Sequence, residues 1–145
     1  MNCARRISLL LMLSATLVAH GAEYSHAVGD QPYTARKAAD CFEISGHAVA
    51  ECVAHFFEES EKELETTFNS ILGRLVRDRQ LFEETQVKWV SFKSSECAVQ
   101  SVSAQAFRDP EAQKRLFVQA CAAELNAQRI LQLKTLSLGC DSCLQ

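Results

Sequence analysis

Hydrophobic residues between positions 45 and 139 recur every three or four residues, which is the spacing of amphipathic helices. The first run begins after Ser45, a residue that favours the N-cap position, and continues for about 28 residues. Its apolar positions are Val49, Cys52, Val53, Phe56, Phe57, Leu64, Phe68, Ile71, Leu72, Leu75 and Val76. Acidic residues fill the opposite face of this helix, and we expect the chain to reverse direction at residues 77–79.

Two further runs predict two further helices. The second extends from about Gln80 to Gln105. The third starts sharply, because Asp109 suits the N-cap and Pro110 suits the first helical position. Gly139 suits the C-terminal cap of the same helix. Because short connections join antiparallel neighbours, residues 45–139 are predicted to form an all-α, antiparallel three-helix bundle.

The second helix carries the only tryptophan of the chain. Helical spacing places this residue on one stripe with a glutamine, a phenylalanine, a lysine (Lys93) and a cysteine (Cys97), so the stripe is expected to lie in the middle of the bundle. Counting residues from each turn places Phe68 opposite the tryptophan and Arg129 level with it. The predicted structural core around the tryptophan consists of Phe68, Gln86, Trp89, Phe92 and Arg129.

The residues before the bundle divide into two segments. Residues 1–22 are typical of a signal peptide, because Arg5 and Arg6 precede a short apolar run that ends in small residues. This run is shorter than the roughly 20 residues that a membrane-spanning helix needs, so no span is expected in the mature chain. Residues 23–44 show no sustained period, and we predict an irregular N-terminal strap there.

Six cysteines remain once Cys3 is removed with the signal, and an even number in a small exported chain is typical of disulfide bonds. Cys97 and Cys121 lie at nearly the same distance from the turn between the second and third helices, which predicts a bond between them. Cys41 and Cys52 are close in the sequence and are expected to pair, although Cys41 has other partners if the strap follows the bundle. Residues 140–145 form a tail that contains Cys140 and Cys143. The simplest assignment is a disulfide bond between these two residues.

Several of these residues together resemble the lysozyme inhibitor LprI-like domain, a family of exported bacterial proteins. The resemblance covers roughly residues 40–136 and is carried by four blocks: Asp40-Cys41 with Glu51-Cys52; Leu64 with Phe68; Gln86-x-x-Trp89-x-x-Phe92 with Cys97; and Cys121, Leu125, Arg129 and Leu133 at intervals of four. This chain has Phe92-Lys93 where the family usually has an aromatic-arginine pair. It also has residues 106–110 in place of a glycine-rich loop, and its Cys-x-x-Cys tail is extra. The resemblance implies a secreted helical domain, in at least one branch able to inhibit lysozyme.

Charge restricts the class of partner. Removal of the signal peptide takes the formal net charge from −3 to −5, which disfavours nucleic acids and favours a basic protein such as lysozyme. We expect the binding surface to comprise acidic residues of the first helix and polar residues at the turn before the third. These candidate partner-binding residues are Glu58, Glu59, Glu61, Gln105, Arg108 and Asp109.

Other functions were weighed against protein binding. His47, Glu51 and His55 share one helical face and could bind a divalent metal, and the Cys140-x-x-Cys143 spacing occurs in redox proteins. A periplasmic metal- or redox-handling protein and an envelope scaffold without lysozyme contact are therefore the alternatives. We find no pattern typical of an enzyme and expect no cofactor. The prediction is a periplasmic or secreted protein-binding module, a candidate lysozyme inhibitor that acts by steric occlusion.

Overall fold

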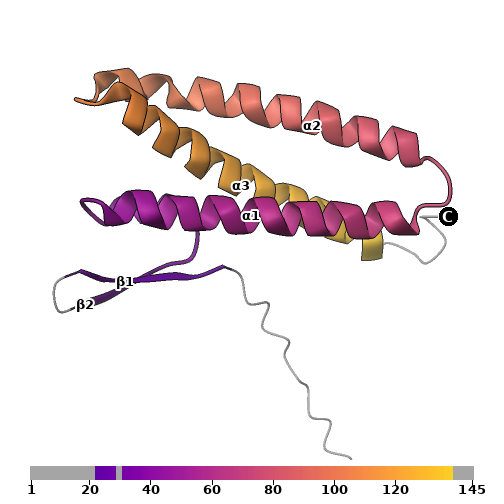
Figure 1. The fold of residues 1–145 in the computed structure, drawn as a ribbon, viewed down its shortest axis with the longest axis horizontal. Coiled ribbons are helices and arrows are strands. Elements are labelled where there is room, and N and C mark those ends of the chain that lie inside the picture. Colours follow the sequence, from indigo (N-terminus) through magenta and orange to yellow (C-terminus); the bar gives the residue numbers. More distant parts are fainter. Residues whose placement is uncertain (1–21, 29–30, 139–145) are drawn as a thin grey trace, which may run out of the picture.

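The computed structural model describes residues 22–28 and 31–138, and it is mostly helical (Figure 1). Outside these residues lie the predicted signal segment except Ala22, the predicted cap at Gly139, and the tail with its proposed Cys140–Cys143 pair. The elements in chain order are β1 (Tyr24–Val28), β2 (Gln31–Ala35), the 3-10 helix η1 (Ala38–Glu43), α1 (Ala48–Arg74), α2 (Arg79–Gln100), the 3-10 helix η2 (Ser101–Ala106) and α3 (Pro110–Leu138).

The three long helices alternate in direction, which confirms the predicted antiparallel bundle (Figure 1). Helix α3 packs against both of the others, whereas α1 and α2 contact each other little. Helix α3 therefore holds the bundle together. Among the described residues, no helix is long and apolar enough to cross a membrane.

Two of the predicted helix boundaries are confirmed by local geometry. The reversal between α1 and α2 occupies residues 75–78, which overlaps the predicted residues 77–79, and Asp78 lies in the left-handed region at a φ of 60°. At the start of α3 the backbone N–H of Ala112 donates to Asp109 Oδ1 at 3.0 Å, and Pro110 is the first helical residue. Asp109 therefore satisfies one of the donors that a helix N-terminus leaves without a partner.

Two other predicted boundaries were wrong. Helix α1 starts at Ala48 after His47, and Ser45 is not its cap, because Gly46 turns the chain at a φ of 71° before the helix begins. Helix α2 ends at Gln100 and not at Gln105, and the chain continues as a tighter 3-10 helix. Hydrophobic spacing does not separate these two helix types well, since a 3-10 turn often extends an α-helix end.

The prediction of an irregular strap was also wrong, because the strap contains an antiparallel β-hairpin followed by a 3-10 helix. Tyr24 pairs with Ala35 and Ala27 with Pro32. Proline is tolerated here because both strands of a two-stranded sheet are edge strands. Neither five-residue strand alternates strictly between apolar and polar residues, and β2 contains a proline, so no strand pattern is evident in the sequence. Ala35 is fully buried and fixes the end of the hairpin to the bundle.

Two disulfide bonds confirm two of the predicted pairings. Cys41 bonds to Cys52 with a Cα–Cα distance of 5.7 Å, which fixes η1 to the first turns of α1. Cys97 bonds to Cys121 with a Cα–Cα distance of 5.5 Å, which joins α2 to α3. Both separations are ordinary for disulfides. We call the part of the bundle around these two bonds the disulfide half.

The hydrophobic core differs between the two halves of the bundle. Around the disulfides the buried residues are mostly small, and they are Ala35, Ala38, Cys41, Ile44, Ala48, Cys52, Val53, Phe56, Cys97, Ala120, Cys121, Ala122 and Ala123. In the other part, which we call the far half, Leu64, Ile71, Ile130 and Leu133 form the core, with Phe68, Leu75, Phe82 and Trp89 packed against them. The far half thus depends on large apolar side chains.

Candidate functional site

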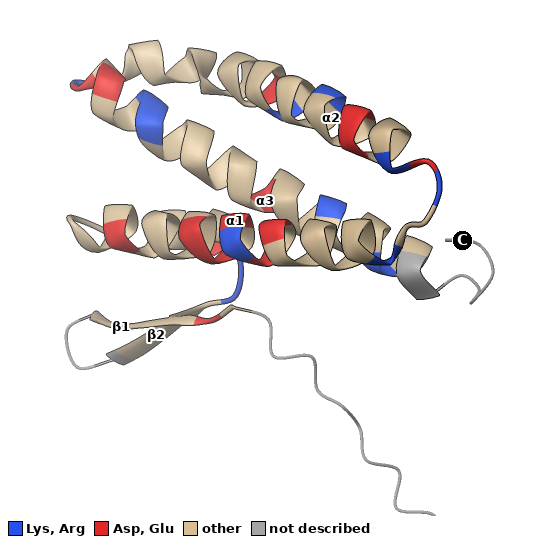
Figure 2. Ribbon diagram, turned by 45° about the vertical axis from the view of Figure 1, so that its right-hand side comes forward, with Lys and Arg blue, Asp and Glu red and all other residues tan. Residues whose placement is uncertain are grey.

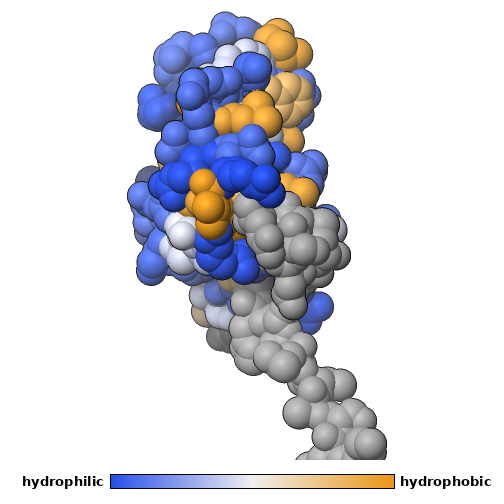
Figure 3. Space-filling model, turned by 90° about the vertical axis from the view of Figure 1, so that its right-hand side faces the viewer, coloured by the Kyte–Doolittle hydropathy of each residue, from blue (hydrophilic) through white to orange (hydrophobic). Residues whose placement is uncertain are grey.

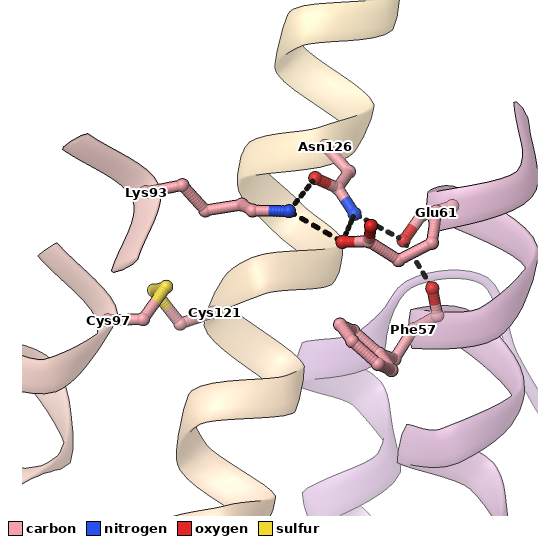
Figure 4. A network of polar contacts seen from close by, with 7 residues as sticks. Phe57, Glu61, Lys93, Cys97, Cys121 and Asn126 are labelled. Carbon is pink, nitrogen blue, oxygen red and sulfur yellow. Dashed lines mark hydrogen bonds and ion pairs between the residues drawn. A yellow bond between two sulfur atoms is a disulfide. The ribbon is translucent and has the colours of Figure 1, made fainter. Parts of the chain in front are cut away.

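A polar network joins all three helices between the two halves (Figure 4). The amine of Lys93 on α2 lies 2.5 Å from Glu61 Oε1 on α1 and 3.0 Å from Asn126 Oδ1 on α3. The Asn126 amide, which is fully buried, donates to Glu61 Oε1 at 2.8 Å and to Ser60 Oγ at 3.1 Å. Each buried polar group of the network therefore has a partner, as a stable protein interior requires.

Lys93, and not Phe92, is the residue of this stripe that faces the bundle. The lysine side chain is 12% exposed, and its Nζ lies 5.1 Å from the centre of the Trp89 ring. Phe92 is 53% exposed, so its predicted place in the structural core is wrong. Adjacent residues lie about 100° apart around a helix, so only one of the two can face inward. Lys93 takes that position because Glu61 and Asn126 both accept hydrogen bonds from its amine.

Glu61 is consequently paired within the protein, although its side chain remains 42% exposed. Burial opposes ionisation of its carboxyl group. The hydrogen bonds from Lys93 and Asn126, with the charge of Lys93, outweigh burial and lower its pKa below the ordinary value. Glu63 on the same helix pairs with Lys134 on α3 at 2.6 Å. Of the predicted acidic surface, Glu58 and Glu59 remain exposed on α1, along which Figure 2 shows several acidic residues.

Trp89 is half-buried against the far half of the core, and two cations lie over its ring. The second cation is the guanidinium of Arg129, which lies 5.8 Å from the ring centre. Arg129 is therefore level with Trp89, as predicted. Its Nε donates to Gln86 Oε1 at 3.3 Å. Burial lowers the pKa of Arg129, although an arginine side chain stays charged in proteins. Phe68, predicted opposite Trp89, packs on the same core and stacks on Phe82 with 4.8 Å between ring centres.

The predicted polar residues at the turn before α3 are all exposed, and they surround a phenylalanine that was not among the predicted site residues. Phe107 is 48% exposed and meets the Phe117 ring edge-on at 5.7 Å. Phe42 of η1 also packs against the Phe117 ring, with 5.7 Å between ring centres. Gln105, Arg108 and Asp109 thus lie beside an exposed aromatic cluster in the disulfide half. An aromatic residue within a short polar connection is the sequence signal that would have identified it.

A surface hollow of about 440 Å³ adjoins this aromatic cluster. Phe42 and Phe117 form part of its wall, with Cys121 of the disulfide and Leu125 further along α3. Glu124 also borders it and accepts a hydrogen bond from the backbone N–H of Ala39 at 3.3 Å. The hollow therefore lies where η1, η2 and α3 meet, on backbone that the disulfides and this hydrogen bond hold in place.

The hypothesis of a metal site at His47, Glu51 and His55 is not supported. Across the described part of the chain, no group of three or more His, Cys, Asp or Glu side chains is placed to hold a metal ion. The His55 ring packs between Tyr24 of the hairpin, at 5.6 Å, and Phe56, at 5.4 Å. The hairpin packs against α1 and thus places His55 among aromatic rings. His55 is therefore not part of a solvent-facing set of metal ligands.

The fold and these surfaces define a small, disulfide-bonded helical domain of the kind that occurs in oxidising compartments. A sequence model of the lysozyme inhibitor LprI family matches residues 39–133, so the chain belongs to that family. No curated protein and no solved structure matches the chain. The family's name describes inhibitors and not enzymes. The disulfide bonds and the family together favour a location outside the cytoplasm.

Proposed function

We propose that this protein is exported to the periplasm or secreted, binds a lysozyme and inhibits it by covering the substrate cleft. The observation that carries the proposal is membership of the lysozyme inhibitor LprI family over residues 39–133. Steric occlusion needs a rigid surface and no reactive group. The two disulfide bonds and the internal ion pair between Lys93 and Glu61 supply that rigidity.

The contact is centred, in this proposal, on the turn between η2 and α3. Phe107 offers a large apolar side chain that is already half-buried against Phe117, so binding costs little side-chain entropy. Aromatic residues of this type often supply most of the energy of a protein interface, and polar residues around them exclude water. Gln105, Arg108 and Asp109 form such a polar surround.

The acidic residues of α1 contribute mainly to the rate of encounter. Lysozymes are usually basic, and a mature chain with a net charge of −5 attracts them over long distances. Glu58 and Glu59 are exposed, whereas Glu61 and Glu63 are partly neutralised by Lys93 and Lys134. We assign the steering role to Glu58 and Glu59 for this reason.

A cell-wall clearing assay tests the proposal. The purified protein is mixed with lysozymes of several types, and the rate of clearing is measured as the inhibitor concentration rises. Inhibition that saturates near a one-to-one ratio supports the proposal, and undiminished clearing at large molar excess contradicts it. Replacing Glu58 and Glu59 by lysine should slow association and flatten its dependence on salt, while leaving the dissociation rate nearly unchanged.

A further inference from the structure

Helix α2 carries an apolar stripe on its solvent side that no other part of the described chain covers. Leu81, Phe92 and Val99 are 59%, 53% and 69% exposed. Their separations of eleven and seven residues place them within about 20° of one another around the helix. Val102 continues the stripe onto η2. In Figure 3, hydrophobic side chains gather on one side of the upper part of the molecule, where α2 lies.

We propose that this stripe is the contact face of a symmetric dimer, in which α2 packs antiparallel against α2 of a second copy. A two-fold axis through Phe92 places each α2 residue of one copy opposite a residue of the second copy. The two residues are equally distant from position 92, one before it and one after it. Lys88 then lies opposite Glu96 of the second copy, and Leu81 reaches the end that carries Val99 and Val102. The face is thus complementary to itself in charge and in apolar surface, as a two-fold interface requires.

Charge selects the antiparallel arrangement over the parallel one. A parallel pair in register would oppose Lys88 to Lys88 and Glu96 to Glu96, which is unfavourable. Lys88 has no carboxylate partner among the described residues, whereas Glu96 accepts a hydrogen bond from the side chain of Gln100 at 2.9 Å. The antiparallel dimer supplies a carboxylate that Lys88 lacks among the described residues of its own chain.

The size of the face sets the strength of association. Helix α2 has 22 residues and is therefore about 33 Å long. A strip of that length and about 10 Å width buries roughly 330 Å² on each copy, compared with about 800 Å² per partner in a standard interface. The dimer is therefore weak and reversible, and it forms only at high protein concentration. It does not depend on lysozyme binding.

Cysteine cross-linking tests the two-fold axis directly. Replacing Phe92 by cysteine places two thiols at the axis, close enough to form a disulfide bond between copies. Val87→Cys is the matched control, because Val87 is an exposed α2 residue about 140° around the helix from Phe92. Under mild oxidation, dimers of Phe92→Cys should form about tenfold faster than those of the control. Equal rates for the two variants would overturn the proposal.

The predicted ion pair gives a second test by sedimentation equilibrium. Lys88→Glu and Glu96→Lys should each weaken the dimer roughly fivefold, because each removes two exposed pairs. The double variant should restore the affinity, and failure to restore it contradicts the antiparallel register. A protein that remains monomeric at the highest attainable concentration refutes the dimer. If the protein is monomeric and Phe92→Asp loses lysozyme inhibition, the stripe is part of the lysozyme contact and not a dimer face.

Discussion

The two halves of the bundle achieve order by different means. In the disulfide half most buried residues are alanine or cysteine, so each buries little apolar surface, and covalent bonds join the elements. In the far half, Leu64, Ile71, Ile130 and Leu133 fill the core, and aromatic residues cover them. Small side chains let η1, η2 and α3 approach closely, but their burial alone contributes less stability than burial of leucine or isoleucine. The disulfide bonds compensate for this deficit.

In our proposal, this difference corresponds to a division of roles. The exposed aromatic cluster and the turn that we propose as the lysozyme contact lie in the disulfide half, where backbone positions are fixed covalently. The far half supplies most of the large-residue core and serves as the scaffold. The network of Lys93, Glu61 and Asn126 lies between them and sets the relative positions of the three helices.

The largest expected loss of stability follows a change in the far half. Leu133 is fully buried, so Leu133→Ala should reduce the free energy of unfolding by about 4 kcal/mol through lost burial and the cavity that remains. Leu131→Ala is the matched control, because Leu131 is exposed on the same helix, and its effect should stay within about 0.5 kcal/mol. Urea unfolding followed by circular dichroism measures both, and similar losses would show that the far half has no specific core.

Removal of the disulfide between α2 and α3 should reduce the free energy of unfolding slightly less than Leu133→Ala does. Replacing Cys97 and Cys121 by alanine should lower the free energy of unfolding by about 3 kcal/mol. The same change at Cys41 and Cys52 should cost roughly 0.7 kcal/mol less, because the bonds span 24 and 11 residues respectively. Thermal and urea unfolding of the two double variants provide the comparison. A negligible loss in both would mean that the disulfide half is held by packing alone.

A smaller effect is expected from the polar network, and it depends on pH. Glu61→Gln should destabilise the protein by about 1 kcal/mol at neutral pH, since the carboxylate is partly exposed. The pKa of Glu61 is lower in the folded protein than in the unfolded chain, so its contribution is complete above the ordinary value of 4.5. The contribution is lost as the pH falls through the folded pKa. The difference between wild type and variant should therefore shrink below about pH 4.5. A difference that stays constant from pH 7 to pH 3 would contradict this role.

The smallest expected effect on folding concerns Phe92. Because its ring is mostly exposed, Phe92→Ala should change the stability of the monomer by less than about 0.5 kcal/mol. Lys93→Ala, one position along the chain, should cost more, since it leaves Glu61 and Asn126 without their shared donor. Unfolding of both variants at low protein concentration separates the two positions. A larger loss of unfolding free energy for Phe92→Ala than for Lys93→Ala would show that Phe92 is part of the core.

Local patterns were sufficient to predict much of the fold. The spacing of hydrophobic residues identified three helices, Asp109 and Pro110 located the start of α3, and equal distance from a turn paired Cys97 with Cys121. These features depend on neighbours in sequence or on a simple antiparallel geometry. The hairpin was not predicted, because neither strand alternates strictly between apolar and polar residues and one of them contains a proline.

Features that depend on distant residues were harder to predict. An aromatic residue is usually preferred to a lysine in a core, and nothing local shows that Lys93 meets Glu61 and Asn126 from two other helices. The same long-range contact pairs Glu61, a predicted partner-binding residue, with Lys93, while 42% of its side chain stays exposed. Phe107 was not predicted, because it lies in a short polar connection where no hydrophobic period links it to Phe117. The exposed aromatic cluster is therefore evident from the structure and not from the sequence pattern.

The most direct test compares one exposed residue from each half in lysozyme inhibition. Phe107→Ala removes the proposed anchor in the disulfide half, and Val76→Ala removes an exposed apolar side chain at the far end of the bundle. The inhibition constant for lysozyme should rise at least about tenfold for Phe107→Ala and stay unchanged for Val76→Ala. Equal inhibition by wild type and Phe107→Ala, or a loss confined to Val76→Ala, would contradict a lysozyme contact in the disulfide half.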